Sequence, residues 1–134
     1  MVTIQENIPL RPKTTLKIGG DARYYAELST KKDGEGAIAF AKEKSVPLIM
    51  LGGGSNTIFA DGTINALVVR LSTDDVEVNG NRVTVAAGKN LAQLINELAE
   101  DNLDLSPLTG IPGTVGGADR KSTRLNSSHQ IISY

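Results

Sequence analysis

The run of three glycines at Gly52, Gly53 and Gly54 constrains the fold of this chain more than any other feature. It interrupts the stretch "LIMLGGGSNTIF", in which an apolar segment stops abruptly at residues without side chains. Residues 48–51 predict a short buried strand, so the glycines lie at its carboxyl end. Glycine there either permits an unusual turn or lets a large group approach the main chain. Ligands of open α/β sheets bind beyond the carboxyl ends of strands, so this loop is a candidate binding site.

Composition excludes several classes of function. The chain has 134 residues, enough for one domain with a core, and its aromatic content of 4% leaves that core to aliphatic side chains. A net charge of −1 provides no basic field for nucleic acid or an anionic membrane. The absence of cysteine and the single histidine, His129, exclude disulfides, thiolate sites and histidine pairs, so we expect no metal. No segment is apolar enough to span a bilayer, residues 1–10 do not form a signal peptide, and we expect a cytoplasmic protein.

The first half of the chain predicts alternating strands and helices. Residues 1–21 contain two prolines and are interpreted as an irregular lead-in segment. Residues 22–28 predict a strand, and residues 64–71 predict another. Between the first strand and residues 48–51, Ala37, Ile38 and Ala41 recur at helical spacing. A strand, a helix and a strand in succession predict a crossover between parallel strands.

The second half begins with a predicted hairpin, "VEVNGNRVTV". Asn79 and Gly80 form a preferred two-residue turn, which would place Val76 opposite Val83. Four valines then share one face of the hairpin, namely Val76, Val78, Val83 and Val85.

A helix is predicted after this hairpin. Asn90 is positioned to cap it, and Gln93 occupies the position that a capping box requires. Its apolar stripe comprises Leu91, Leu94, Ile95, Leu98 and Ala99.

A second glycine-rich segment, "LSPLTGIPGTVGGA", follows at residues 105–118 and has neither helical nor strand periodicity. Each glycine segment has a plain interpretation, a tight turn for the first and a surface loop for the second. Each also has a chemical one, because successive backbone N–H groups can converge on an anion. Two such loops could hold one extended ligand, with a diphosphate against one and a planar ring against the other.

Three segments carry a resemblance to a known family: "TTLKIGGDARYYAEL", "LGGGSNTIFADG" and "LSPLTGIPGTVGGA". In order and spacing they resemble signatures of the UDP-N-acetylenolpyruvoylglucosamine reductases (MurB), over about residues 10–118. The resemblance implies an α+β fold, the incomplete two-lobed FAD-binding domain of the vanillyl-alcohol-oxidase (PCMH) type. Its lobes would span about residues 22–71 and 72–118. The wider superfamily shares the first loop, so another flavin oxidoreductase is an alternative, and a stand-alone FAD- or nucleotide-binding module is a second.

The resemblance also implies a cofactor, a reaction and a set of contacts. FAD would be bound non-covalently, since residues 1–118 contain no histidine or cysteine to tether it. NADPH would be the reductant of a UDP-sugar enolpyruvyl ether, a step of bacterial peptidoglycan synthesis. The pyrophosphate loop would be Gly52, Gly53, Gly54, Ser55 and Asn56. The flavin segment would be Gly110, Ile111, Pro112, Gly113, Thr114, Gly116 and Gly117. Gly88 is a weaker match, and Lys17 and Gly19 are expected to serve folding.

The resemblance stops after Ala118. Residues 119–134, "DRKSTRLNSSHQIISY", resemble an in-frame translation of a sequencing adapter, so we expect a non-native, disordered tail. The family's catalytic serine, glutamate and arginine would lie beyond this point. We therefore assign no catalytic residue and expect the fragment to be inactive alone.

Overall fold

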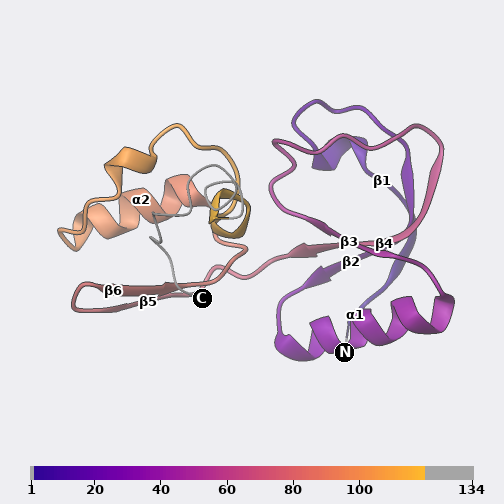
Figure 1. Ribbon diagram of the computed structural model, residues 1–134, viewed down its shortest axis with the longest axis horizontal. Coiled ribbons are helices and arrows are strands. Elements are labelled where there is room, and N and C mark those ends of the chain that lie inside the picture. The colour runs from indigo at the N-terminus through magenta and orange to yellow at the C-terminus, as the bar shows by residue number, and fades with distance from the viewer. Residues whose placement is uncertain (1, 120–134) are drawn as a thin grey trace. The chain divides into compact units, whose positions relative to one another are not determined.

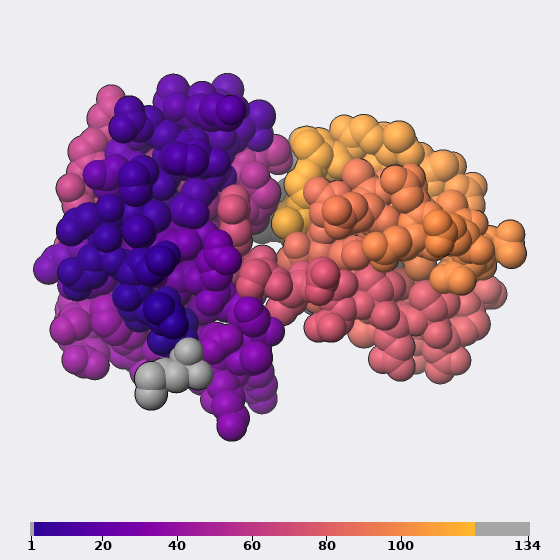
Figure 2. All heavy atoms as spheres, turned by 180° about the vertical axis from the view of Figure 1, so that it is seen from behind, coloured from indigo at the N-terminus to yellow at the C-terminus, as the bar shows by residue number. Residues whose placement is uncertain are grey.

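The structure is a computed structural model, which describes residues 2–119. Its contacts divide the chain into two compact units, Met1–Ser72 and Thr73–Tyr134. Figures 1 and 2 colour the first unit from indigo to magenta and the second from pink to yellow. Of the predicted disordered tail, residues 120–134 lie outside the described residues. Within residues 2–119, no helix has both the length and the apolar character needed to cross a bilayer.

The first unit is built on a four-stranded sheet in the order β1-β2-β4-β3. β2 (Asp21–Leu28), β4 (Thr63–Leu71) and β3 (Leu48–Leu51) are parallel, which confirms the three predicted strands. β2 and β3 are not neighbours, because β4 lies between them and pairs with both. The central strand β4 is buried at residues 66–69, as expected of a parallel strand covered on both faces.

The interpretation of residues 1–21 as an irregular lead-in is wrong. They contain β1 (Gln5–Pro9), which pairs antiparallel with β2, and a 3₁₀ turn at Arg11–Lys13. Pro9 ends the strand at the sheet edge, where its missing N–H costs no ladder bond. The lead-in is therefore part of the first unit.

Each face of this sheet has its own core. Helix α1 (Lys31–Lys44) buries Ala37 and Ala41 against Tyr24, Leu67 and Val69, and Figure 1 shows it along one face of the sheet. The opposite face packs a second set of side chains: Leu10, Ala22, Tyr25, Leu51, Phe59 and Val68. Ile38, which the sequence places on the apolar side of the helix, is 51% exposed.

The ends of α1 are fixed by local hydrogen bonds. Thr30 and Asp33 form a reciprocal capping box, with Asp33 accepting from the Thr30 backbone N–H at 2.9 Å. The backbone N–H groups of Ser29 and Thr30 and the Thr30 hydroxyl stabilise the carboxylate and lower the pKa of Asp33 below its usual value. At the other end, Ser45 adopts a left-handed conformation that terminates the helix.

Gly19 and Gly20 let two main-chain segments meet. A Cβ on Gly20 would lie 1.7 Å from the Gly62 carbonyl oxygen, and one on Gly19 would lie 2.8 Å from the Phe59 carbonyl oxygen. The Gly20 N–H donates to Ala60 O at 2.8 Å. The close packing of Gly19 agrees with the structural role expected for it.

The second unit begins with the hairpin of β5 (Val76–Asn79) and β6 (Arg82–Val85). Val76 pairs with Val85, not with Val83, so the predicted register is wrong by two residues. The turn residues are Gly80 and Asn81, and Gly80 has a φ of 62°. Glycine at the first central position suits a type II′ turn, whereas the predicted Asn79-Gly80 turn has asparagine at that position. A two-residue shift preserves the faces, so the four valines remain together.

The predicted helix in this unit is confirmed as α2 (Leu91–Glu100), with Asn90 as its cap. Leu91, Leu94 and Leu98 are buried, whereas Ala99 is exposed. The core of the unit joins these leucines to Val85, Val115 and Ala118. The glycine-rich segment, predicted without regular structure, contains a 3₁₀ turn at Ser106–Leu108 and helical residues 115–118. This helical turn continues into Asp119, so the prediction of a disordered tail is wrong for its first residue.

Candidate functional site

The first candidate site is the loop formed by Gly52–Asn56. β3 and β4 run parallel, so their carboxyl ends meet at the same edge of the sheet. Leu51, the last residue of β3, pairs with Arg70 near the end of β4. The glycine loop therefore leaves the sheet beside a cationic side chain.

Gly54 is fixed by main-chain packing. It is buried, has a φ of 78°, and its Cβ position lies 2.2 Å from the Lys13 carbonyl oxygen and 2.8 Å from Thr14 Cα. The Thr15 N–H donates to the Gly54 carbonyl at 2.9 Å. Gly54 therefore has the structural role of a turn glycine, because its positive φ and the lack of space both disfavour a side chain.

The neighbouring residues of the loop are open. Gly52, Gly53, Ser55 and Asn56 are exposed. Within residues 2–119, the backbone N–H groups of Gly53 and Ser55 have no hydrogen-bond acceptor. Free, closely spaced amides of this kind can bind an anion without any side-chain charge.

Arg70 contacts this candidate loop, and the sequence analysis did not predict that contact. Its Nε donates to the Gly52 carbonyl at 3.1 Å and its Nη2 to the Lys13 carbonyl at 3.0 Å. The signal available in the sequence was a single charged residue inside the apolar strand "INALVVRL".

A buried tyrosine lies near this loop. Tyr25 donates from its hydroxyl to Glu27 at 3.1 Å, and Lys13 Nζ lies 4.3 Å from the centre of the Tyr25 ring. Burial raises the pKa of Tyr25 to about 12; the negative charge of Glu27 adds to this shift, and the positive charge of Arg70 opposes it. The phenol is therefore neutral near pH 7 and is no candidate base.

The second candidate loop, residues 110–117, is attached to the segment before α2. Gly113 O accepts from the Leu91 N–H at 3.0 Å, and the N–H groups of Val115 and Gly116 donate to Lys89 O and Ala87 O at 2.8 and 2.9 Å. A Cβ on Gly116 would lie 3.0 Å from Ala87 Cβ, so Gly116 lets the two segments approach. The other residues of this loop that were predicted to contact the flavin differ in solvent exposure. Gly110, Pro112 and Gly117 are exposed, while Ile111, Gly113 and Thr114 are half-buried.

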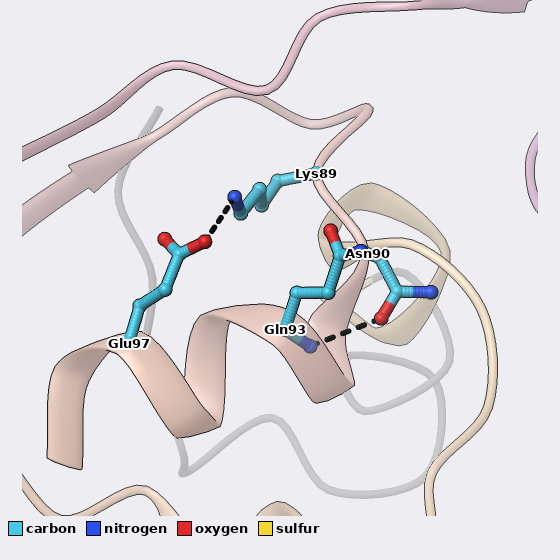
Figure 3. A network of polar contacts seen from close by, with 4 residues as sticks. All are labelled: Lys89, Asn90, Gln93 and Glu97. Atoms are coloured by element: carbon cyan, nitrogen blue, oxygen red, sulfur yellow. Dashed lines mark hydrogen bonds and ion pairs between the residues drawn. The ribbon is translucent and has the colours of Figure 1, made fainter.

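The segment that anchors the second loop carries a buried lysine. Lys89 Nζ lies 2.8 Å from Glu97 Oε1, and the lysine side chain is 7% exposed against 51% for the glutamate. Figure 3 shows this pair beside the Asn90 cap, whose side-chain oxygen accepts from the Gln93 N–H at 3.1 Å. The ion pair and the cap fix the start of α2, and with it the residues to which the glycine loop is bonded.

Comparison with known proteins identifies the family. Residues 22–121 match the family described as FAD binding domain, which is well over half of the chain. The chain belongs to the FAD binding domain family. FAD is the cofactor of this family.

The similarity of this FAD binding domain to individual proteins is also specific. It is 36% identical over 119 residues to the UDP-N-acetylenolpyruvoylglucosamine reductase of Desulforamulus reducens, covering 87% of this chain and 39% of that protein. The Lactobacillus acidophilus reductase is 37% identical over 118 residues, with coverages of 87% and 40%. The chain therefore spans about two fifths of the curated relatives that it matches.

Solved structures confirm the mixed α+β fold. The UDP-N-acetylenolpyruvylglucosamine reductase of Thermus caldophilus superposes with a TM-score of 0.71 at 29% identity, covering 88% of this chain and 41% of that one. Cholesterol oxidase from B. sterolicum superposes with a TM-score of 0.59 at 19% identity, covering 88% and 24%, and shares the fold alone. Together with the match to the FAD binding domain family, these likenesses support the predicted FAD-binding fold.

The first loop of this FAD binding domain fits a phosphate-bearing cofactor. The exposed backbone N–H groups of Gly53 and Ser55 are donors without an acceptor among residues 2–119. Thr14 packs against Gly54 through its Cα. Its side-chain hydroxyl is buried and has no hydrogen-bond partner among residues 2–119. A polar atom left unpaired at this point indicates a loop that is not fully satisfied by the protein itself.

Proposed function

We propose that this chain is the FAD-binding part of an NADPH-dependent reductase that converts UDP-N-acetylglucosamine enolpyruvate to UDP-N-acetylmuramate. The family match and the reductase relatives support the cofactor and the reaction class. The single observation that carries the proposal is the first glycine loop, whose free amides lie at the carboxyl end of β3. The reaction belongs to cytoplasmic peptidoglycan precursor synthesis in bacteria, and with it to cell-wall biogenesis, cell shape and the cell cycle.

Within this proposal each loop has its own task. Gly52, Gly53, Ser55 and Asn56 present backbone and side-chain donors to the diphosphate, and Gly54 holds the loop on the Lys13–Thr14 segment. Gly110–Gly117 provides the segment that lies along the flavin: Gly110, Ile111, Pro112, Gly113, Thr114, Gly116 and Gly117. FAD is held non-covalently, since residues 1–118 have neither histidine nor cysteine.

The chemistry is divided between cofactor and protein. When bound, FAD supplies hydride transfer from NADPH to the substrate double bond. The described residues bind and orient the cofactor, and we assign no acid or base among them. Tyr25, the titratable group with the most strongly raised pKa, is engaged with Glu27 and stays neutral.

The test combines binding with turnover. We expect the recombinant chain to quench the fluorescence of added FAD with saturation. We expect no NADPH oxidation when the enolpyruvyl UDP-sugar is added. Failure to bind FAD would refute the proposal, and measurable turnover would refute the assignment of the chain as a binding part only.

A stand-alone FAD- or nucleotide-binding module is the second candidate function. It is favoured by the observation that both loops are internally anchored within residues 2–119, each on its own unit. Tight FAD binding by the chain without any reductase activity in the intact gene product would support it. Another flavin oxidoreductase of the superfamily would instead oxidise NADPH with a different acceptor.

A further inference from the structure

Arg70 occupies an unusual position for a charged residue. It follows four buried residues of the central strand β4 and is itself half-buried. Its strand neighbours are Leu51 on β3 and Glu27 on β2. Within residues 2–119 the Arg70 guanidinium makes no ion pair, so its charge is not neutralised by a contacting carboxylate.

The Arg70 guanidinium donates hydrogen bonds to two main-chain carbonyl groups. Nε donates to the Gly52 carbonyl and Nη2 to the Lys13 carbonyl, so one planar group joins the glycine loop to the segment packed on Gly54. Arginine is suited to this task because its donors have a fixed forked geometry. A lysine ammonium in the same place has no such geometry.

Because the peptide group is planar, the hydrogen bond from Arg70 to the Gly52 carbonyl also determines where a backbone N–H of the loop points. In a trans peptide the carbonyl of one residue and the N–H of the next point opposite ways. The Gly52 carbonyl points to Arg70, so the Gly53 N–H points away from it. The Thr15 N–H fixes the Gly54 carbonyl in the same manner, so the Ser55 N–H points away from Thr15.

We propose that Arg70 is the positioning residue of the first glycine loop, holding the Gly52 carbonyl so that the Gly53 N–H can bind a diphosphate. The inference rests on the proposed function, which supplies the diphosphate, and it adds a residue and a role. Arg70 acts through the loop peptide and is not itself a ligand contact. A hydrogen bond to a charged group is worth about tenfold or more in affinity, which sets the expected effect of losing it.

The test follows individual backbone amides. The full chain, labelled with ¹⁵N, is titrated with sodium pyrophosphate, against sodium chloride of equal ionic strength. We expect the Gly53 and Ser55 amide resonances to shift in the wild type. Arg70→Lys keeps the positive charge but loses the forked donor geometry of the guanidinium. In this variant the pyrophosphate affinity measured from the Gly53 amide shift should fall about tenfold. The Ser55 amide, positioned through the bond from Thr15 to the Gly54 carbonyl, should still shift.

Arg23→Lys is the matched control, because Arg23 lies on β2 and its Nη1 donates to the Asn65 side chain at 2.7 Å, away from the loop. It should leave both amide responses unchanged. An undiminished Gly53 response in Arg70→Lys, or no Gly53 response in the wild type, would overturn the inference. A parallel FAD titration separates the two proposals: FAD binding without a Gly53 response overturns only the role of Arg70. A pyrophosphate response without FAD binding overturns only the proposed function.

Discussion

Substitution of Gly54 by alanine tests whether the first loop is held by backbone packing. The new Cβ would lie 2.2 Å from Lys13 O and 2.8 Å from Thr14 Cα, and both are backbone atoms that cannot rotate away. A left-handed conformation costs a residue with a Cβ about 1–2 kcal/mol. Overpacking adds about 1–3 kcal/mol, so the free energy of unfolding should fall by roughly 2–5 kcal/mol. That is a large part of the about 5–15 kcal/mol typical of a domain.

Two other glycines separate these costs. Gly62 has a φ of 85° but its Cβ position is open, so Gly62→Ala should lose only the conformational part, about 1–2 kcal/mol. Gly34 lies in α1 with open space, and Gly34→Ala should raise stability by about 0.5–1 kcal/mol.

Urea unfolding of the three variants, followed by far-UV circular dichroism, measures the differences. Equal stability of Gly54→Ala and Gly62→Ala, within about 0.5 kcal/mol, would refute the packing argument, since the steric term alone is about 1–3 kcal/mol.

Three further predictions concern other residues. Thr14→Val removes a buried hydroxyl without a partner, so we expect the melting temperature to stay the same or rise, and a clear fall would show that the hydroxyl is paired. Glu97→Gln leaves Lys89 buried without its carboxylate and should cost about 1–2 kcal/mol, more than Lys89→Met, and the reverse order in urea unfolding would contradict this. The pKa of Asp33 is lowered in the folded state, so its stabilising contribution is present above its ordinary pKa of about 3.8 and is lost as the pH falls through the lower folded value. Asp33→Asn should therefore flatten the acid limb of the stability profile, and an unchanged limb would exclude this contribution.

Locally encoded elements could be predicted from the sequence. The apolar stripe and the Asn90 cap specify α2 within a dozen residues, and the apolar runs at residues 48–51 and 64–71 specify β3 and β4. The resemblance of the glycine loops to a known family gave the FAD-binding fold correctly. The assignment of individual loop residues to the cofactor remains a prediction.

The errors arise where partners distant in sequence decide the outcome. β1 contains few strand-forming residues and exists because β2 offers it an edge, which no local pattern records. The hairpin register depends on whether Asn79 or Gly80 opens the turn, and both choices keep the valines on one face. Arg70 could not be assigned to the loop because its acceptors, Gly52 and Lys13, meet only in the folded sheet.

The position of β4 between β2 and β3 has a consequence for synthesis of the chain. β3 pairs only with β4, and β4 is also the second partner of β2, beside β1. When a nascent chain has emerged from the ribosome only as far as residue 51, β3 therefore has no strand with which to pair. The sheet can close only after about twenty more residues have emerged, a delay of roughly one to four seconds at ordinary translation rates.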